Sequence, residues 1–363
     1  MTDLLYSEAE EDLRSAVRAL LTDRNDPARV VVRAEEGAPY DAGLWKALAA
    51  DMGVAGLLVP EDLGGQGASH REVAVVLEEL GRGVVPAPYL TSAVVATQVL
   101  LACDVEKAEV ASLLGELASG RRTAALVARF AAGPDGFRPR QGLDGVLAGV
   151  ADAATADVLL VPTTEGLYAV ERAGAGVRVE PQIPLDLTRP LASVTLAGAP
   201  ATLLAGPEQA EAAVRQGLLA GAGLLASEQL GLAEWCLEET VRYTKERHQF
   251  NRPVGSFQAL KHRMAQVWLE VVSARAAARN AADALATGSD EAPLAVAIAQ
   301  AYCARVAVHA AEECVQLHGG IGMTWEHPAH LYLKRAKADQ IAFGSAGAHR
   351  ESIGRLVGLV APQ

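Results

Sequence analysis

Apolar positions recur with helical spacing at both ends of the chain and with strand-like spacing between them. Residues 1–118 and 207–363 predict helices, and residues 119–206 predict short strands. The segments between 119 and 206 are too short and too closely spaced for strand–helix–strand units, which argues against a doubly wound sheet. The pattern therefore predicts a mainly α fold with a small β domain: an N-terminal helical domain, a middle antiparallel β domain and a C-terminal four-helix bundle.

Local signals place the helices of the first region. Ser7 and Glu10 have the spacing of a capping box ahead of an amphipathic run that ends at Leu21. A further helix is expected to run up to Met52, and a loop rich in Pro and Gly follows it. The remaining helices of this region are expected over HREVAVVLEELGRG, ended by Gly81 and Gly83, and over 91–101 and 105–118.

The middle and last regions differ in the length of their segments. Six β-prone runs are separated by Gly, Pro and Asp: TAALVA, DGVLAGV, DVLLVPT, GLYAVER, GVRVEP and ASVTLAG. After them, residues 207–250 predict one long helix or a pair of helices. Pro253 and Gly255 break that pattern, and further helices are expected over 257–286, 291–318 and 349–360.

Composition excludes several classes of protein. Half of the residues are hydrophobic but only 4% are aromatic, so Ala, Val and Leu must fill the core. A net charge of −12 argues against a nucleic-acid-binding protein. An anionic ligand must therefore be held by a few local cations. No unbroken apolar run reaches the roughly 20 residues of a membrane span, and the acidic start lacks the features of a signal peptide. The four cysteines form no CxxC pair, so we expect a cytoplasmic protein with reduced thiols.

Two groups of residues are candidates for binding an anionic ligand. Arg247 and Phe250 are one helical turn apart near an expected helix end, and Gln258 follows the break. Arg offers a planar, permanently charged group suited to a diphosphate, and Phe can cover an aromatic ring. The simpler interpretation makes Arg247 a solvated charge and Phe250 a core residue.

The second group is a glycine-rich turn. Its members are Gln316, Gly319, Gly320 and Gly322. Glycines allow a phosphate or ribose to approach the backbone and its N–H groups closely. By itself, a GGxG turn more often just ends a helix.

Three stretches of the chain resemble the acyl-CoA dehydrogenase family: GLLVPEDLGGQGAS with VLEELGR, RHQFNRPVGSFQALKHRMA, and QLHGGIGMTWEHPAHLYLKRAKADQI. The resemblance spans nearly the whole chain. It implies a tetramer, bound FAD and α,β-desaturation of an acyl-CoA thioester. It also implies that Arg247, Phe250, Gln258, Gln316, Gly319 and Gly320 reach the ADP half of an FAD that is held mainly by a neighbouring subunit.

Two features that the resemblance leads us to expect are missing. The reaction needs a carboxylate to remove the α-proton while the flavin accepts the β-hydride. Phe343 stands at the usual position of that Glu, and the alternative position lies in QGLLAGAG, which contains no acid. The middle region also lacks the family's flavin-ring motif, because the corresponding stretch reads LVARFAAGPDGFRP.

The selective loss of one half of a site suggests a heteromer. The chain resembles the base-less subunit of the α2β2 acyl-CoA dehydrogenases of actinobacterial steroid side-chain breakdown. That resemblance implies a second, different dehydrogenase chain as the partner, one FAD for each pair of unlike chains and a bulky steroid acyl-CoA as substrate. Two alternatives remain open: a homomeric enzyme with a relocated base at Glu228, Asp339, Glu351 or Glu326, and a non-catalytic scaffold. A flavin oxidase or monooxygenase on the same fold is a third.

Overall fold

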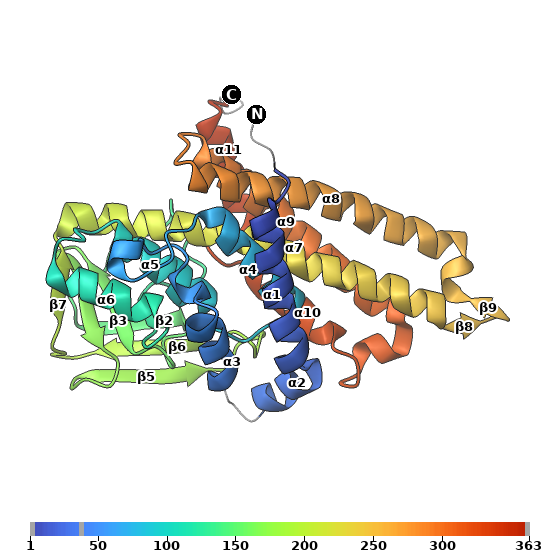
Figure 1. Cartoon of the computed structure of the whole chain (residues 1–363), viewed down its shortest axis with the longest axis horizontal. Coiled ribbons are helices and arrows are strands. Elements are labelled where there is room, and N and C mark those ends of the chain that lie inside the picture. The colour runs from blue at the N-terminus through green and yellow to red at the C-terminus, as the bar shows by residue number, and fades with distance from the viewer. Residues whose placement is uncertain (1–3, 36–39, 360–363) are drawn as a thin grey trace.

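The computed structural model describes residues 4–35 and 40–359, in which helices flank a middle region of strands (Figure 1). The first region contains α1 (Glu8–Arg24), α2 (Pro27–Glu35), α3 (Ala42–Lys46), η1 (Ala47–Asp51), η2 (Val54–Gly56), η3 (Glu61–Leu63), α4 (His70–Arg82), η4 (Tyr89–Ala96), α5 (Thr97–Leu101) and α6 (Ala108–Ala118). The predicted capping box is present, since the Ser7 side chain accepts from the Glu10 N–H and the Glu10 carboxylate accepts from the Ser7 N–H.

Two sheets make up the middle region. One has the order β1 (Ala124–Leu126), β3 (Val158–Thr163), β4 (Gly166–Glu171) and β7 (Thr202–Ala205), and the other has the order β2 (Gly145–Ala151), β6 (Leu191–Leu196) and β5 (Val177–Gln182). Every pairing between these strands is antiparallel except that of β1 with β3, which is parallel. The six predicted runs are confirmed as strands. The sequence interpretation missed β7 and did not anticipate the parallel pair.

The last region is built around one long helix. Residues 207–246 form the single helix α7 (Pro207–Glu246), which settles the choice between one helix and two. The chain continues through β8 (His248–Gln249), β9 (Arg252–Pro253), η5 (Val254–Ser256), α8 (Gln258–Ala286), α9 (Ala292–His318), η6 (Gly319–Met323), α10 (Ala329–Asp339) and α11 (Ala346–Leu356). Helix α7 crosses the whole molecule, from the sheets to the β8–β9 hairpin (Figure 1).

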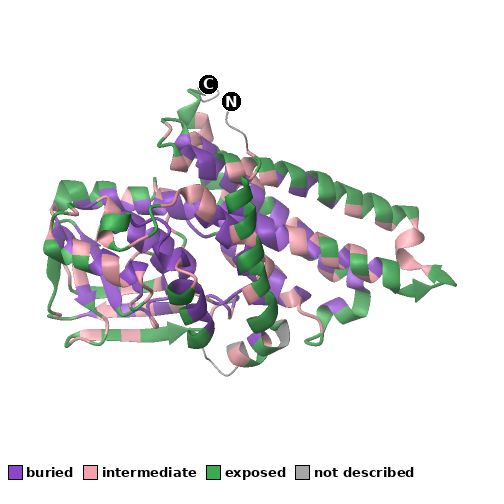
Figure 2. Cartoon of the chain, viewed as in Figure 1, coloured by how far each residue is buried: buried purple, intermediate pink, exposed green. Residues whose placement is uncertain are grey.

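One stretch of the bundle is apolar enough to resemble a membrane span. The most apolar 18-residue window within residues 292–323 has a mean hydropathy of 1.4, and 67% of that window is buried inside the fold. Because α9 packs against α7, α8, α10 and α11, it is the central helix of the bundle (Figure 2). Such a buried core helix passes the same test of length and composition as a membrane span.

Two expected helix ends need correction. Gly81 does not end its helix, because α4 continues to Arg82 and is capped by Gly83. The last helix begins at Ala346, earlier than the expected His349, and ends at Leu356. The expected end at Val360 lies outside the described residues.

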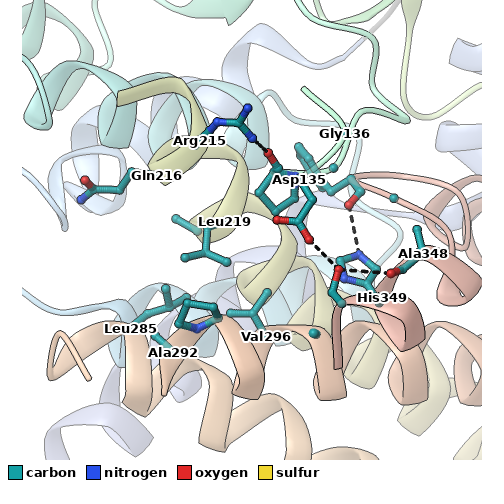
Figure 3. Close-up of a pocket in the computed structure, with 18 of the residues that line it drawn as sticks. Asp135, Gly136, Arg215, Gln216, Leu219, Leu285, Ala292, Val296, Ala348 and His349 are labelled. Carbon is teal, nitrogen blue, oxygen red and sulfur yellow. Dashed lines mark hydrogen bonds between the residues drawn. The ribbon is translucent and has the colours of Figure 1, made fainter. Parts of the chain in front are cut away.

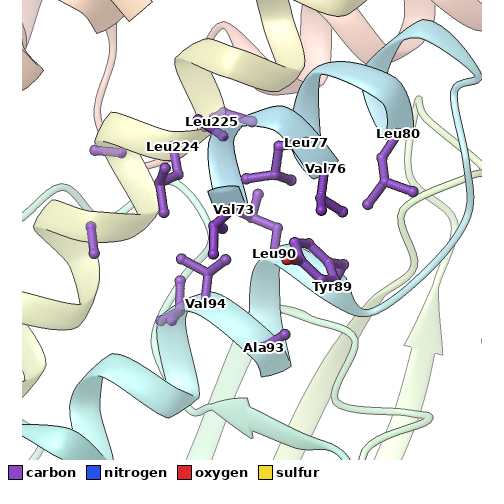
Figure 4. Packing of buried hydrophobic residues seen from close by; sticks show 14 of the residues in the cluster. Val73, Val76, Leu77, Leu80, Tyr89, Leu90, Ala93, Val94, Leu224 and Leu225 are labelled. Carbon is purple, nitrogen blue, oxygen red and sulfur yellow. The ribbon is translucent and has the colours of Figure 1, made fainter. Parts of the chain in front are cut away.

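The N-terminal helices pack against α7 through an apolar layer and a very close backbone contact. Side chains of α4 and η4, among them Leu77 and Leu90, interdigitate with Leu224 and Leu225 of α7 (Figure 4). Where the two helices cross, a Cβ atom on Gly81 would lie 2.0 Å from the carbonyl oxygen of Glu228. A Cβ on Gly231 would lie 1.8 Å from the carbonyl oxygen of Glu78. Glycine at both positions therefore lets α4 approach α7.

We expect Gly231→Ala to lower the free energy of unfolding by at least about 2 kcal/mol, because the added methyl group would collide with helix backbone that has no rotamer to change. Urea denaturation followed by circular dichroism measures the loss. Gly354→Ala in α11 is the control, since its Cβ would meet nothing closer than 3.9 Å. It should gain up to about 1 kcal/mol from helix propensity. Equal stabilities of the two variants would contradict the close crossing.

Candidate functional site

Phe343 occupies the position where the family resemblance leads us to expect the catalytic carboxylate. It lies between α10 and α11, its side chain is 3% exposed, and its φ is +50°. That conformation is costly for a bulky residue. Hydrogen bonds hold it in place: the Phe343 N–H donates to the carbonyl oxygen of Phe130 at 2.8 Å, and His349 Nε2–H donates to the Phe343 carbonyl at 3.0 Å.

The segment around Phe343 lies directly on the stretch that replaces the flavin-ring motif. The rings of Phe130 and Phe343 pack edge to face with their centroids 5.3 Å apart. A Cβ on Gly133 would lie 2.7 Å from the Phe343 carbonyl oxygen. The other expected base position adjoins the same ring, because a Cβ on Gly221 would lie 3.0 Å from its tip. The two positions at which a base is expected, neither of which holds an acid, therefore both lie at the buried Phe343 side chain.

A cavity of about 1090 Å³ lies on the other side of this contact, between α7, the turn from α8 to α9, and α11 (Figure 3). Its walls include Leu219, Leu285 and Val296. Asp135 and Asp290 are the carboxylates among the described residues that line it. Hydrogen bonds from Ser352 and Arg355 outweigh partial burial and lower the pKa of Asp135. A carboxylate held ionised in this way is a weak proton acceptor.

The acids considered as relocated bases do not reach this cavity. Glu228 and Asp339 are buried, and neither lines the cavity. Glu351 and Glu326 are exposed. Arg335 pairs with Asp186 and Glu228.

Glu228 and Asp339 belong to a buried ion cluster that joins the sheets to the helices. Arg335 of α10 donates from Nε to Asp186 at 2.6 Å and from Nη2 to the hydroxyl of Thr188 at 2.7 Å. It also donates to Glu228 of α7, which accepts a second hydrogen bond from Arg189. Burial opposes ionisation of Glu228, but the two arginines outweigh it and lower its pKa. The cluster is therefore a structural link between the β5–β6 loop, α7 and α10.

Asp339 is the member of this cluster whose charge is not compensated. Neither of its carboxyl oxygens has a hydrogen-bond partner among the described residues, and Arg189 is 3.7 Å away. Burial, only partly offset by the arginines, raises the pKa of Asp339 to about 8. The carboxyl group is therefore protonated in the folded chain at neutral pH.

We expect Asp339→Asn to flatten the dependence of stability on pH. The pKa of this carboxyl group is raised from an ordinary 3.8 in the unfolded chain to about 8 in the folded chain. Its ionisation therefore favours the unfolded chain increasingly as pH rises between these values. The free energy of unfolding of the variant minus that of the unmodified chain should be larger at pH 8.5 than at pH 5 by at least about 1 kcal/mol. Urea denaturation across this range measures the difference, and parallel stability curves would show that Asp339 is ionised throughout.

Arg247, Phe250 and Gln258 lie around the hairpin that follows α7. The sequence interpretation placed Arg247 and Phe250 on one helix face, but α7 ends at Glu246. Phe250 and Asn251 form the tip of the β8–β9 hairpin, with φ values of +53° and +59°. Positive φ at both positions is the pattern of a type I′ turn, in which Phe is unusual. The turn leaves the Phe250 side chain 85% exposed, so it is not a core residue.

Gln316, Gly319 and Gly320 lie at the end of α9 and at the start of η6, and all three are exposed. A Cβ on Gly319 or Gly320 would meet nothing within 4 Å, so their backbone faces open space. Gly322 differs, because a Cβ there would lie 2.5 Å from the carbonyl oxygen of Val315, and its role is packing. The α7 and α9 ends lie side by side, since the Tyr243 and His318 rings stack 4.3 Å apart.

These exposed groups fit one half of an FAD molecule. The Arg247 side chain makes no ion pair or hydrogen bond with any described residue, which leaves its guanidinium free for a diphosphate. The open glycines and the projecting Phe250 can approach a ligand that arrives from outside this chain. The flavin-ring half does not fit in the same way. The flavin ring and the substrate would have to lie between Phe343 and Phe130, and these two residues are in direct contact.

Comparisons with known proteins agree with this fold and site. Residues 7–121 match the model of the acyl-CoA dehydrogenase N-terminal domain, and residues 211–358 match that of the C-terminal domain. The acyl-CoA dehydrogenase IpdE2 of Mycolicibacterium smegmatis is 37% identical over 96% of this chain and 98% of the relative. The chain belongs to the acyl-CoA dehydrogenase family. The family consists of FAD-dependent oxidoreductases, so the predicted fold class and cofactor are confirmed.

Two similar solved structures are complexes of two named chains. The ChsE4-ChsE5 complex of Mycobacterium tuberculosis has a TM-score of 0.87 and 28% identity, covering 99% of this chain and 100% of the other. The steroid ACAD Tcur3481-Tcur3483 has a TM-score of 0.84 and 30% identity, covering 97% of this chain and 98% of the other. These likenesses confirm the resemblance to heteromeric steroid dehydrogenases.

Sequence reasoning did not find the contacts around Phe343. The motif comparison identified the missing carboxylate, but Phe130, Gly133 and Gly221 are far from Phe343 in the chain. A Gly-rich stretch without acids was the available signal for Gly221. Nothing in the sequence indicated that it adjoins Phe343.

Proposed function

We propose that this chain is the base-less subunit of a heteromeric, FAD-dependent acyl-CoA dehydrogenase. A different dehydrogenase chain supplies the catalytic glutamate and the flavin-ring pocket, and this chain completes the ADP half of that FAD. The reaction is α,β-desaturation of an acyl-CoA thioester. When bound, FAD accepts the β-hydride.

The contact between Phe343 and Phe130 carries this proposal. Abstraction of the α-proton and acceptance of the β-hydride require the substrate to lie between the base and the flavin ring. In this chain the two corresponding segments are hydrogen-bonded to each other, and the buried Phe343 ring packs against the partly buried Phe130 ring in that space. An intact active site within this chain would require breaking that contact, and Phe cannot accept a proton.

The exposed half-site supports a contribution to a partner's cofactor. Arg247 would pair with the diphosphate, Phe250 would cover an aromatic portion of the cofactor, and Gln258 and Gln316 would donate hydrogen bonds. The Gly319 and Gly320 backbone would permit close approach. A scaffold without flavin would have no need for an arginine side chain without a partner at one helix end and two open glycines at the neighbouring helix end.

The proposed substrate is an acyl-CoA with a bulky, ring-containing acyl group such as a steroid side-chain thioester. Support comes from the similarity to a two-chain steroid ACAD. A homomeric enzyme is less well supported, because Glu228 and Asp339 are held in the buried ion cluster and Asp135 is paired with Arg355.

The test compares the chain purified alone with the chain co-expressed with a glutamate-bearing dehydrogenase encoded beside it. We expect little FAD and no desaturation from the chain alone, and one FAD per pair of unlike chains with turnover from the complex. FAD is quantified by absorbance after denaturation, and desaturation is followed with an artificial electron acceptor. A full complement of FAD with turnover from the chain alone would support the homomeric alternative. A stable complex without flavin would support the scaffold.

A further inference from the structure

A carboxylate lies between two imidazole rings near the end of α7. Glu239 Oε1 is 3.3 Å from His327 Nε2 and 3.7 Å from His318 Nε2. The His318 side chain is fully buried, and its Nε2 makes no hydrogen bond to a described residue. The two imidazole centroids are 4.2 Å apart. This group has no place in the site described above.

The other nitrogen of each ring fixes its orientation. His318 Nδ1 is 2.6 Å from the carbonyl oxygen of Cys314, so it donates there and directs Nε2 at Glu239. His327 Nδ1 accepts from the Ala329 N–H at 3.2 Å, so its Nε2–H donates to Glu239. The carboxylate therefore holds both rings at once.

The position of the two histidines gives this group a function. His318 is the last residue of α9, directly before Gly319, and His327 ends the loop that contains Gly319 and Gly320. Glu239 thus ties both ends of that loop to α7. One turn further along α7, Tyr243 stacks on His318, and Arg247 follows at the helix end. This contact links the loop to the helix from which the Arg247 hairpin extends.

We propose that Glu239 is a positioning residue that fixes the loop containing Gly319 and Gly320 relative to Arg247, and so sets the affinity of the complex for FAD. This inference rests on the proposed function. Glu239 does not itself touch the cofactor. Its effect is transmitted through His318 and His327.

A direct carboxylate–imidazole contact accounts for this group better than a metal ion does. The three side chains offer ligand atoms within 4.8 Å of one another, which is close enough to share a cation. However, Arg242 already donates to both oxygens of Glu239, at 2.5 and 2.9 Å. His327 Nε2 also carries a proton in this arrangement, whereas a ligating nitrogen must be free. Metal binding is therefore an outcome that the test must exclude.

The test uses Glu239→Ala in the co-expressed complex, with Glu313→Ala as a matched control. The control carboxylate is equally buried, with 15% of its side chain exposed against 14% for Glu239. It pairs with Arg263 and lies within 3.8 Å of a histidine, His309. We expect the dissociation constant for FAD, measured by flavin fluorescence, to rise about tenfold in Glu239→Ala only. Turnover at saturating FAD should stay within about twofold of the unmodified complex.

Hydrogen exchange of the chain purified alone tests the contact without FAD. Amides of residues 318–328 should exchange about tenfold faster in Glu239→Ala and at an unchanged rate in Glu313→Ala. Because this measurement does not need the partner, it separates failure of this inference from failure of the proposed function. A complex that holds no FAD in its unmodified form would refute the proposed function.

The dependence of FAD affinity on pH provides a readout that a purely steric role would not change. Charged or titratable groups around His318 are Glu239, Arg242, Tyr243, Cys236, Cys314 and His327. Burial lowers the pKa of His318, but its interactions with Cys314 and with the nearby Glu239 carboxylate outweigh burial and raise the pKa to about 9. Because this pKa is raised, the ion pair between protonated His318 and Glu239 is fully formed below about pH 6.5 and is lost as pH rises through about 9. FAD affinity should fall over that range, and Glu239→Gln should abolish the fall.

Three results would overturn the inference. One is equal FAD affinity and equal loop exchange in Glu239→Ala and Glu313→Ala. Another is an unchanged pH dependence in Glu239→Gln. The third is a stoichiometric metal ion in the purified complex, detected by plasma mass spectrometry and lost in Glu239→Ala, which would make these residues metal ligands instead.

Discussion

Arg335→Met is expected to lower the free energy of unfolding by about 3–5 kcal/mol, the usual cost of removing one partner from a buried ion pair. Arg335 is 2% exposed and donates to Asp186, Glu228 and Thr188. Methionine matches much of its volume, so the loss would come from buried carboxylates left without their cation. Chemical denaturation measures it, and transitions of the sheets and the helices observed separately would show whether the two regions come apart.

Lys337→Met is the control for this prediction. Lys337 lies on the same helix and pairs with Glu312 at 2.7 Å, but both side chains are substantially exposed, at 38% and 50%. Water screens such a pair, and its loss should cost less than about 1 kcal/mol. A similar loss in both variants would mean that the buried cluster contributes no more than a surface pair.

Arg247→Ala is expected to weaken FAD binding by the co-expressed complex about 10- to 100-fold, the value of one or two charge-assisted hydrogen bonds to a diphosphate. The Arg247 side chain is exposed and has no hydrogen-bond or ion-pair partner among the described residues, so the fold itself should be unaffected. Fluorescence titration of the flavin-free complex with FAD measures the change, and Arg247→Lys should recover only part of it because the bidentate geometry is lost.

Lys245→Ala tests whether this effect is specific. Lys245 is an exposed cation in the last turn of α7, beside Leu237 and Val241 and outside the candidate site. It should leave FAD affinity unchanged. An equal loss in Lys245→Ala would reduce the role of Arg247 to general electrostatic attraction, and no loss in either variant would remove Arg247 from the site.

These predictions assign separate roles to the two ends of α7. At the sheet end, Gly221 and Glu228 lie in a closed interior that contains Phe343 and the ion cluster. At the hairpin end, Phe250 is exposed and packs edge to face with Phe257, and the Arg247 side chain has no hydrogen-bond or ion-pair partner among the described residues. This division supports the proposal that the chain completes the cofactor site of another subunit.

The sequence by itself determined the order of helices and strands and the family, and it predicted the missing carboxylate and the residues of a cofactor half-site. These depend on periodicity, capping residues and contiguous motifs, which are local in the chain. The capping box of Ser7 and Glu10 and the break at Pro253 are examples.

Only the tertiary structure shows which side chains fill the expected reaction site and which contacts position the exposed candidate residues. Phe343 meets Phe130, Arg335 meets Asp186, and Glu239 meets His318 and His327 across 79 to 213 positions of chain. No periodic pattern records such contacts, because they depend on how helices and sheets pack. The same applies to Glu228 and Asp339: an acid on a helix reads as a surface charge until packing shows that arginines from other elements surround it.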